Sequence, residues 1–301
     1  MSKALHQPPL NTSQMGMVIA AANYFDLPVT TKQAFFESGH GFMVNTGKDM
    51  CPSGPYVWDA RRFRSQLSNF GLHAQTLGTV FPGEADDNRL NLQSQIRHAM
   101  QAGKVIGLGH WDYQVVLDAN DQGFQLSQPW DSETPTTPGF LTADSWKELA
   151  NAPPIEVIAF TKCEPLDDVI RTDAALQYAL DVFNSPEDFQ HPGYGLGLNA
   201  YPIWRDSLSH ETYDMHGQWW NATVWSECRL MTGQYMQDFS SANSAFTKGL
   251  NALGDLYVKL AETICESAPQ DVPNRKKLEL ISQAEELENQ CVNHLRTLPW
   301  N

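Results

Sequence analysis

The sequence predicts an α+β protein, in which helices packed on an antiparallel sheet are followed by an all-α helical domain. Three observations support this class. The first hundred residues carry mostly helical periodicity, residues 105–160 alternate with a period of two, and the strand pattern ends near residue 165. We therefore expect two domains, residues 1–164 and residues 165–301.

Four helices are expected before the first strand. Residues 14–25 are apolar on nearly every side, which predicts a buried helix with Thr12 or Ser13 as its N-cap. The other three are expected at residues 31–38, 57–70 and 90–102, each closed by a glycine.

The alternating region predicts the sheet. Apolar and polar residues alternate over four segments, residues 105–108, 113–117, 124–128 and 155–160. The turn residues Asn120 to Gly123 separate the second segment from the third, so we expect these two strands to form a hairpin.

After residue 165 the periodicity is helical again. Helices are expected at residues 167–184, 200–208, 213–239, 242–267 and 275–298. The long apolar helices after residue 213 would offer a face for a homodimer, and the sequence leaves the oligomeric state open.

Composition and charge exclude several classes of protein. A formal charge of −15 and the lack of a basic face argue against a nucleic-acid-binding protein. No apolar run is long enough to span a membrane, and the N-terminus lacks the apolar core of a signal peptide. Five dispersed cysteines without a Cys-x-x-Cys pair favour a reducing cytoplasm over a disulfide or zinc scaffold. We expect no metal and no cofactor.

Two segments contain candidate catalytic residues. Ser13 stands at the start of the buried helix, where the helix dipole and unpaired N–H groups stabilise negative charge. His110 opens the segment "GHWDYQVVLDANDQGFQLSQPW" at what we expect to be the start of a strand. Each residue also has an ordinary structural role, Ser13 as a helix cap and His110 as a satisfied histidine.

These segments resemble papain-like proteins. "TSQMGMVIAAANYFDLPVT" resembles the opening helix of the double-glycine cysteine peptidases, and the His110 segment resembles their His-strand-turn-strand-Asp-Pro region. The order of the two domains, with "GYGLGLNAYPIWRDSL" and "NQCVNHL" in the second, is similar to the family of the butirosin-biosynthesis acyltransferase.

The resemblance implies an acyltransferase or an amide- or thioester-processing enzyme. It places Ser13 at the nucleophile, His110 at the general base, Gln7 at the oxyanion-hole glutamine and Gln128 at the group that orients the histidine. The acyl donor would be a small molecule or a carrier-protein thioester, and the acceptor an amine.

Two departures from the family pattern leave alternatives open. Ser13 replaces a cysteine and Gln128 replaces an aspartate, and an amide cannot stabilise an imidazolium with a full charge. Asp112 and Asp131 are nearby carboxylates that would substitute for Gln128, and Cys51 is a rival nucleophile in a Gly/Pro-rich loop. The competing hypothesis is an inactive papain-like domain that binds a carrier protein or a peptide.

Overall fold

The computed structural model describes residues 4–84, 86–130, 139–142, 145–146, 154–210 and 212–299. The chain divides into two compact units. Unit 1 comprises Met1–Val29 and Phe70–Pro165, and unit 2 comprises Thr30–Asn69 and Leu166–Asn301. The protein is therefore α+β, with the antiparallel sheet in unit 1 and most of the helices in unit 2.

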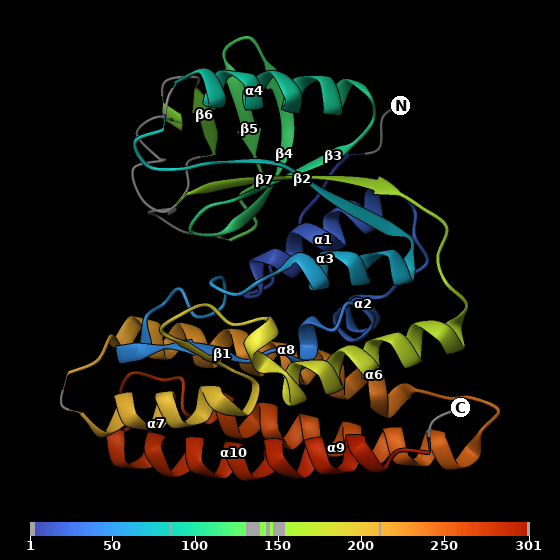
Figure 1. Ribbon diagram of the computed structural model, residues 1–301, viewed down its shortest axis with the longest axis vertical. Helices are drawn as coiled ribbons and strands as arrows, with labels where there is room; N and C mark the ends of the chain where they lie inside the picture. The colour runs from blue at the N-terminus through green and yellow to red at the C-terminus, as the bar shows by residue number, and fades with distance from the viewer. Residues whose placement is uncertain are drawn as a thin grey trace. The chain divides into compact units, whose positions relative to one another are not determined.

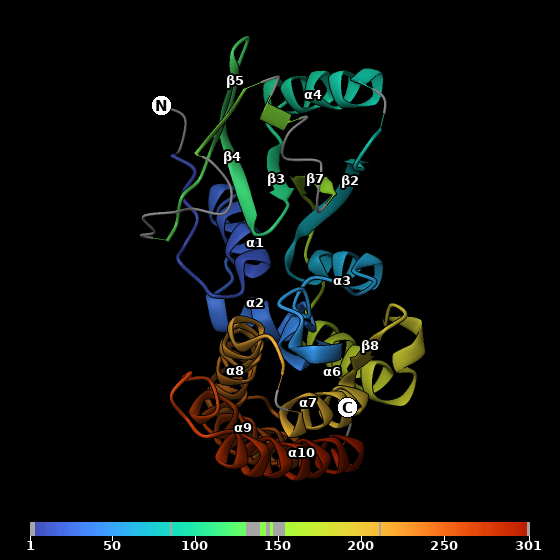
Figure 2. The ribbon, with the colours of Figure 1, turned by 90° about the vertical axis from the view of Figure 1, so that its left-hand side faces the viewer.

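Unit 1 is built, in the described residues, on a sheet of six antiparallel strands in the order β2-β7-β3-β4-β5-β6. Their bounds are β2 Leu72–Val80, β3 Val105–Gly109, β4 Tyr113–Asn120, β5 Gly123–Leu126, β6 Phe140–Thr142 and β7 Ile155–Lys162. The predicted hairpin is confirmed as β4–β5 (Figure 2). The Asn120 side chain closes it, because its Oδ1 accepts hydrogen bonds from the N–H groups of Gln122 and Gly123.

Two helices, α1 (Ser13–Tyr24) and α4 (Asp86–Gln101), cover opposite faces of this sheet. Ile106 and Leu108 of β3 belong to the core beneath α4, whereas Gly107 between them lies against Met17 of α1. A Cβ atom on Gly107 would come within 2.1 Å of the Met17 sulfur, so a larger residue here would force the Met17 side chain to move. Figure 1 shows α4 above the sheet and α1 below it.

Unit 2 is mainly helical. Its first segment holds α2 (Thr31–Glu37), α3 (Arg61–Gln66) and β1 (Asn45–Gly47), with the 3-10 turns η1 (His40–Phe42), η2 (Lys48–Met50) and η3 (Leu67–Phe70, whose last residue is in unit 1). Its second segment holds α6 Asp168–Asn184, η4 Pro186–Asp188, β8 Tyr194–Leu196, η5 Gly197–Asn199, α7 Ala200–Ser209, α8 Met215–Asp238, α9 Ser244–Glu266 and α10 Asn274–Thr297. β1 pairs antiparallel with β8 and so joins the two segments.

A buried ion pair lies in the core of unit 2. Arg229 of α8 and Glu288 of α10 are both fully buried and meet at 2.7 Å. The Tyr201 hydroxyl donates to the same Glu288 oxygen at 2.8 Å, and Arg229 donates to the carbonyl of Gly41 at 2.9 Å. These bonds fix three helices and the η1 turn to one another through a single charged pair.

The His40 ring lies in an aromatic cluster of unit 2. Its centroid is 5.6 Å from that of Trp58, 5.2 Å from that of Phe63 and 6.3 Å from that of Trp225. His40 is 1% exposed. Burial lowers the pKa of His40 to about 3, and the charge of Arg229 acts in the same direction. The imidazole is therefore neutral throughout the physiological pH range.

Several elements differ from the prediction. β2, β6 and the β1–β8 pair were not expected, and β8 contradicts the expectation that no strand follows residue 165. The predicted helix over residues 57–70 is shorter, because Trp58 forms a β-bridge with Gln190 and α3 begins only at Arg61.

The division into units also differs from the predicted domains of residues 1–164 and 165–301. The chain passes from unit 1 to unit 2 after Pro165, where the domain boundary was expected. Residues 30–69, however, belong to unit 2 and not to unit 1. The reason is that α2 packs against α8 and β1 pairs with β8. Within the described ranges, no helix combines the length and the apolarity that crossing a membrane requires.

Candidate functional site

Ser13 lies at the start of α1, as the sequence predicts, but it is completely buried. Thr12, not Ser13, occupies the N-cap position, and the Thr12 side chain makes no capping hydrogen bond. The Ser13 hydroxyl accepts a hydrogen bond of 3.1 Å from the backbone N–H of Tyr113, the first residue of β4. Ser13 therefore connects the start of the helix to the start of a strand.

Gln7 is also buried, and its side-chain amide pairs with the backbone of β4. Its Nε2 donates to the carbonyl of Tyr113 at 2.8 Å, and its Oε1 accepts from the N–H of Val115 at 2.9 Å. The Ser127 hydroxyl donates to the same Oε1 at 2.6 Å. The amide thus makes the hydrogen bonds to the β4 backbone that a neighbouring strand would make. These bonds hold the segment before α1 to the sheet.

Two further residues, Gln114 and Ser127, complete this cluster and were missed by the sequence analysis. Both are buried, and Gln114 Nε2 donates to the Ser127 carbonyl. Ser127 Oγ also accepts from the N–H of Val115 at 3.1 Å. The sequence signal was uneven: Gln114 is a polar residue beside the apolar run Val115 to Leu117, whereas Ser127 has the polar neighbours Gln125 and Gln128. We call Gln7, Ser13, Gln114 and Ser127 the β4 clasp.

His110 does not start a strand. It lies in the bend between β3 and β4, three residues before Tyr113, and its N–H donates to the carbonyl of Asp112 at 3.0 Å. The residue is 8% exposed, and its ring meets Trp111 edge-on at 5.8 Å between centroids. The prediction of a strand position was wrong because Trp111 and Asp112 are needed to turn the chain. A bond from the Ser13 hydroxyl to the His110 ring stays a prediction.

Two of the three residues expected to orient His110 are described, and neither Gln128 nor Asp112 is buried. Gln128 is exposed, and its Nε2 donates to the carbonyl of the preceding residue, Ser127, at 3.0 Å. Asp112 is half-buried in the β3–β4 bend. Asp131 lies outside the described residues.

Cys51, the rival nucleophile, belongs to unit 2, whereas Ser13 and His110 belong to unit 1. Its sulfur lies 2.8 Å from the Ser53 hydroxyl, which is 2.7 Å from the Tyr194 hydroxyl. Burial raises the pKa of Tyr194, which stays a neutral hydrogen-bonding phenol. Cys51 is the C-cap residue of η2 and does not stand at the start of a helix.

The β4 clasp consists of neutral amides and hydroxyls that bond to one another and to the β4 backbone. Such a network rigidifies a core, because every buried polar group that it satisfies would be costly to leave unpaired. In the part of the chain that the structure describes, no three histidine, cysteine, aspartate or glutamate side chains gather to hold a metal ion.

A scan against protein-family models gave no match to this chain, and a search of curated proteins gave none either. The interpretation of the site therefore depends on its geometry.

Proposed function

We propose that unit 1 is a papain-like domain whose catalytic positions have become structural, and that the protein acts by binding a peptide or a carrier protein. One observation carries this proposal. Gln7 and Ser13, which the resemblance places at the oxyanion hole and the nucleophile, bond to the backbone of β4. A nucleophile has to reach its substrate, and the Ser13 side chain is 0% exposed.

The arrangement of α1 supports the papain-like part of the proposal. A buried helix packs against β3 and β4 of an antiparallel sheet, and Ser13 stands at its N-terminus. The charge of the chain bears on the partner. A net charge of −15 accelerates association with a basic partner and slows association with an acidic one. A basic peptide is therefore favoured over an acidic carrier protein.

Acyl transfer through Ser13 is the second candidate. It is favoured by the position of Ser13 in the first turn of α1, where the dipole and the Tyr113 N–H would stabilise an oxyanion. His110 would take the hydroxyl proton as Ser13 Oγ attacks the acyl thioester and the donor thiol leaves with that proton. An amine would then attack the acyl-Ser13 ester, and the Ser13 hydroxyl would be released as the amide forms. This candidate requires Ser13 and His110 to become accessible together.

An acylation experiment distinguishes the two candidates. The full chain is incubated with the acetyl thioester of N-acetylcysteamine, treated with neutral hydroxylamine to cleave thioesters on cysteines, and measured by intact mass. Binding without catalysis predicts no remaining oxoester in the wild type after hydroxylamine. It also predicts no thioester at position 13 in Ser13→Cys, for which the mass is measured and the adduct located before the hydroxylamine step. A hydroxylamine-resistant adduct that disappears in Ser13→Ala but persists in Cys51→Ala would refute the proposal.

A further inference from the structure

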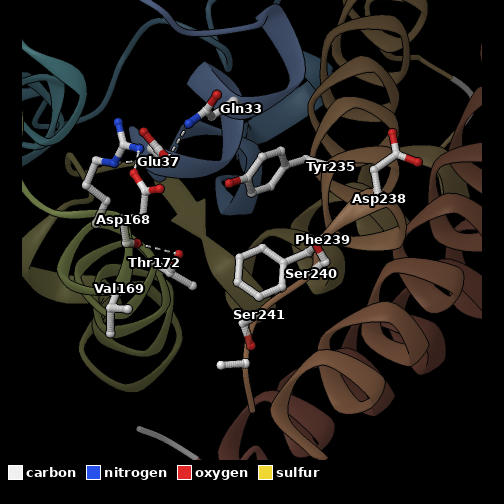
Figure 3. Close-up of a pocket in the computed structure, with 12 residues that line it drawn as sticks. Gln33, Glu37, Asp168, Val169, Thr172, Tyr235, Asp238, Phe239, Ser240 and Ser241 are labelled. Carbon is white, nitrogen blue, oxygen red and sulfur yellow. Dashed lines mark hydrogen bonds and ion pairs between the residues drawn. The ribbon is translucent and has the colours of Figure 1, made fainter. Parts of the chain in front are cut away.

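Unit 2 contains a cavity of about 430 Å³ that none of the residues considered above lines. Three helices, α2, α6 and α8, form its walls, and the connection from α8 to α9 closes one side (Figure 3). The lining is mixed, with carboxylates on one side and aromatic rings on the other. Its residues are Gln33, Glu37, Asp168, Val169, Arg171, Thr172, Tyr235, Asp238, Phe239, Ser240, Ser241 and Ala242.

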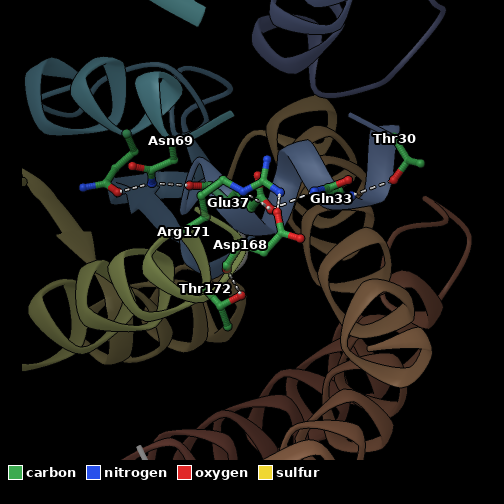
Figure 4. Close-up of polar contacts among 8 residues, drawn as sticks. Thr30, Gln33, Glu37, Asn69, Asp168, Arg171 and Thr172 are labelled. Carbon is green, nitrogen blue, oxygen red and sulfur yellow. Dashed lines mark hydrogen bonds and ion pairs between the residues drawn. The ribbon is translucent and has the colours of Figure 1, made fainter. Parts of the chain in front are cut away.

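Glu37 carries the strongest indication of a ligand. This last residue of α2 is 1% exposed. Its Oε1 accepts from Gln33 Nε2 at 2.8 Å and lies 3.5 Å from Arg171 Nε (Figure 4). Its buried Oε2 has no hydrogen-bond partner among the described residues. A buried carboxylate oxygen without a donor is costly, so a donor supplied by a ligand would be favourable.

The charges around Glu37 are unbalanced. Arg171 bonds to Asp168 as well as to Glu37, so one guanidinium faces two carboxylates. Asp238 has its own partner in Lys32, at 2.8 Å. Burial raises the pKa of Glu37, and hydrogen bonding from Gln33 and the charge of Arg171 offset only part of that effect. The cavity therefore lacks one positive charge.

Aromatic rings supply the remaining wall. Tyr235 and Phe239 meet edge-on with centroids 6.3 Å apart, and the centroid of the Phe36 ring lies 4.8 Å from that of Tyr235. Figure 3 shows the Phe239 ring within the cavity and the Tyr235 hydroxyl turned toward the side of Glu37. Ring faces attract cations and cover apolar groups.

We infer that this cavity binds a small organic ammonium ion with an apolar body. The buried Glu37 carboxylate turns toward the cavity and accepts from the ligand N–H groups at Oε2, and the apolar body packs on Tyr235 and Phe239. An anion is disfavoured, because Arg171 is already engaged by two carboxylates. A bare metal ion is disfavoured as well, because no metal-binding cluster is found among the described residues. This site is independent of the function proposed for unit 1.

The test uses the full chain with 2-phenylethylamine as the probe and 2-phenylethanol as its neutral counterpart, measured by titration calorimetry. The wild type is expected to bind the amine at least ten-fold more tightly than the alcohol. Glu37→Gln keeps the shape and an acceptor but removes the charge, and it should weaken amine binding at least ten-fold. Glu262→Gln makes the same chemical change at an exposed glutamate of α9 that does not line the cavity, so it is the matched control and should change the affinity less than two-fold.

Two further measurements keep the outcome clear. Phe239→Leu preserves the charge and should weaken binding of the amine several-fold, even if Glu37→Gln were poorly folded. Amine binding should strengthen as pH rises through the pKa of Glu37, with Asp168, Arg171 and Tyr235 as the other titratable groups that face it. Equal affinity for amine and alcohol, no binding of the amine, or an unchanged affinity in a folded Glu37→Gln variant would overturn the inference.

Discussion

Replacing His40 by phenylalanine should make unit 2 less sensitive to mild acid. In the unfolded chain this imidazole takes up a proton below its ordinary pKa of 6.5, whereas the buried ring stays neutral down to about pH 3. Between these values the unfolded state binds more protons than the folded state, so stability falls as pH falls. Phenylalanine suits the same aromatic cluster and cannot titrate.

The size of the effect follows from the two pKa values. The full difference of 6.5 to about 3 corresponds to roughly 5 kcal/mol at about 1.4 kcal/mol per pKa unit. At about pH 5 His40 is protonated only in the unfolded chain. The free energy of unfolding is then roughly 2 kcal/mol lower than at about pH 7.5. This is a large part of the stability of an ordinary domain.

Urea denaturation at a series of pH values measures the effect. Trp58 and Trp225 touch His40, so tryptophan fluorescence reports unfolding of its surroundings. Other titrating groups, Glu37 among them, contribute equally to wild type and His40→Phe, so they cancel in the difference between the two curves. That difference should decline by roughly 2 kcal/mol from about pH 7.5 to about pH 5. A difference that is constant over this range would show that His40 is not held neutral by burial.

Three substitutions test the contacts that hold each unit, each by urea denaturation. Gln7→Ala should lower the free energy of unfolding by about 2–3 kcal/mol, because it removes the side-chain partners of buried backbone groups in β4. A loss under about 0.5 kcal/mol would mean that water replaces the amide. Glu288→Gln should cost about 3–5 kcal/mol, since it leaves the Arg229 guanidinium buried without its counter-ion; near-equal stability would argue that Arg229 can reorient. Gly41→Ala should lower the free energy of unfolding by about 1–3 kcal/mol, because its Cβ would lie 1.5 Å from the Thr232 hydroxyl oxygen. Adding Thr232→Ala should recover part of this loss. A Gly41→Ala protein as stable as wild type would contradict the close approach.

The elements that the sequence predicted are those whose pattern is local. The hairpin at Asn120 to Gly123 combines alternation on both sides with turn residues between them, and it forms as expected. β2 was missed because it is an edge strand, half-exposed along most of its length, with little apolar alternation to reveal it. The three-residue pair of β1 with β8 depends on partners 150 residues apart, and no local pattern specifies such a pairing.

Two of the four residues of the β4 clasp, Gln7 and Ser13, were candidates in the sequence, whereas Gln114 and Ser127 were not. Gln7 and Ser13 do meet the start of β4, yet their roles depend on which atoms donate and accept, and a residue type does not reveal that. Glu37 was not among the predicted site residues, because a glutamate on a short helix is usually exposed to solvent. Only the packing of α6 and α8 around it makes the carboxylate unusual.

The discontinuity of unit 2 has a consequence for the newly made protein. Its first segment ends at Asn69 and its second begins at Leu166, so about a hundred residues are translated before Tyr235 and Tyr257, the partners of Phe36 and Phe42, are made. At ordinary rates of synthesis the ribosome needs roughly 5–20 s for that length. During this interval Phe36 and Phe42 can contact each other but not the helices α8 and α9 that bury them. The nascent chain should therefore be a client of chaperones that act at the ribosomal exit tunnel.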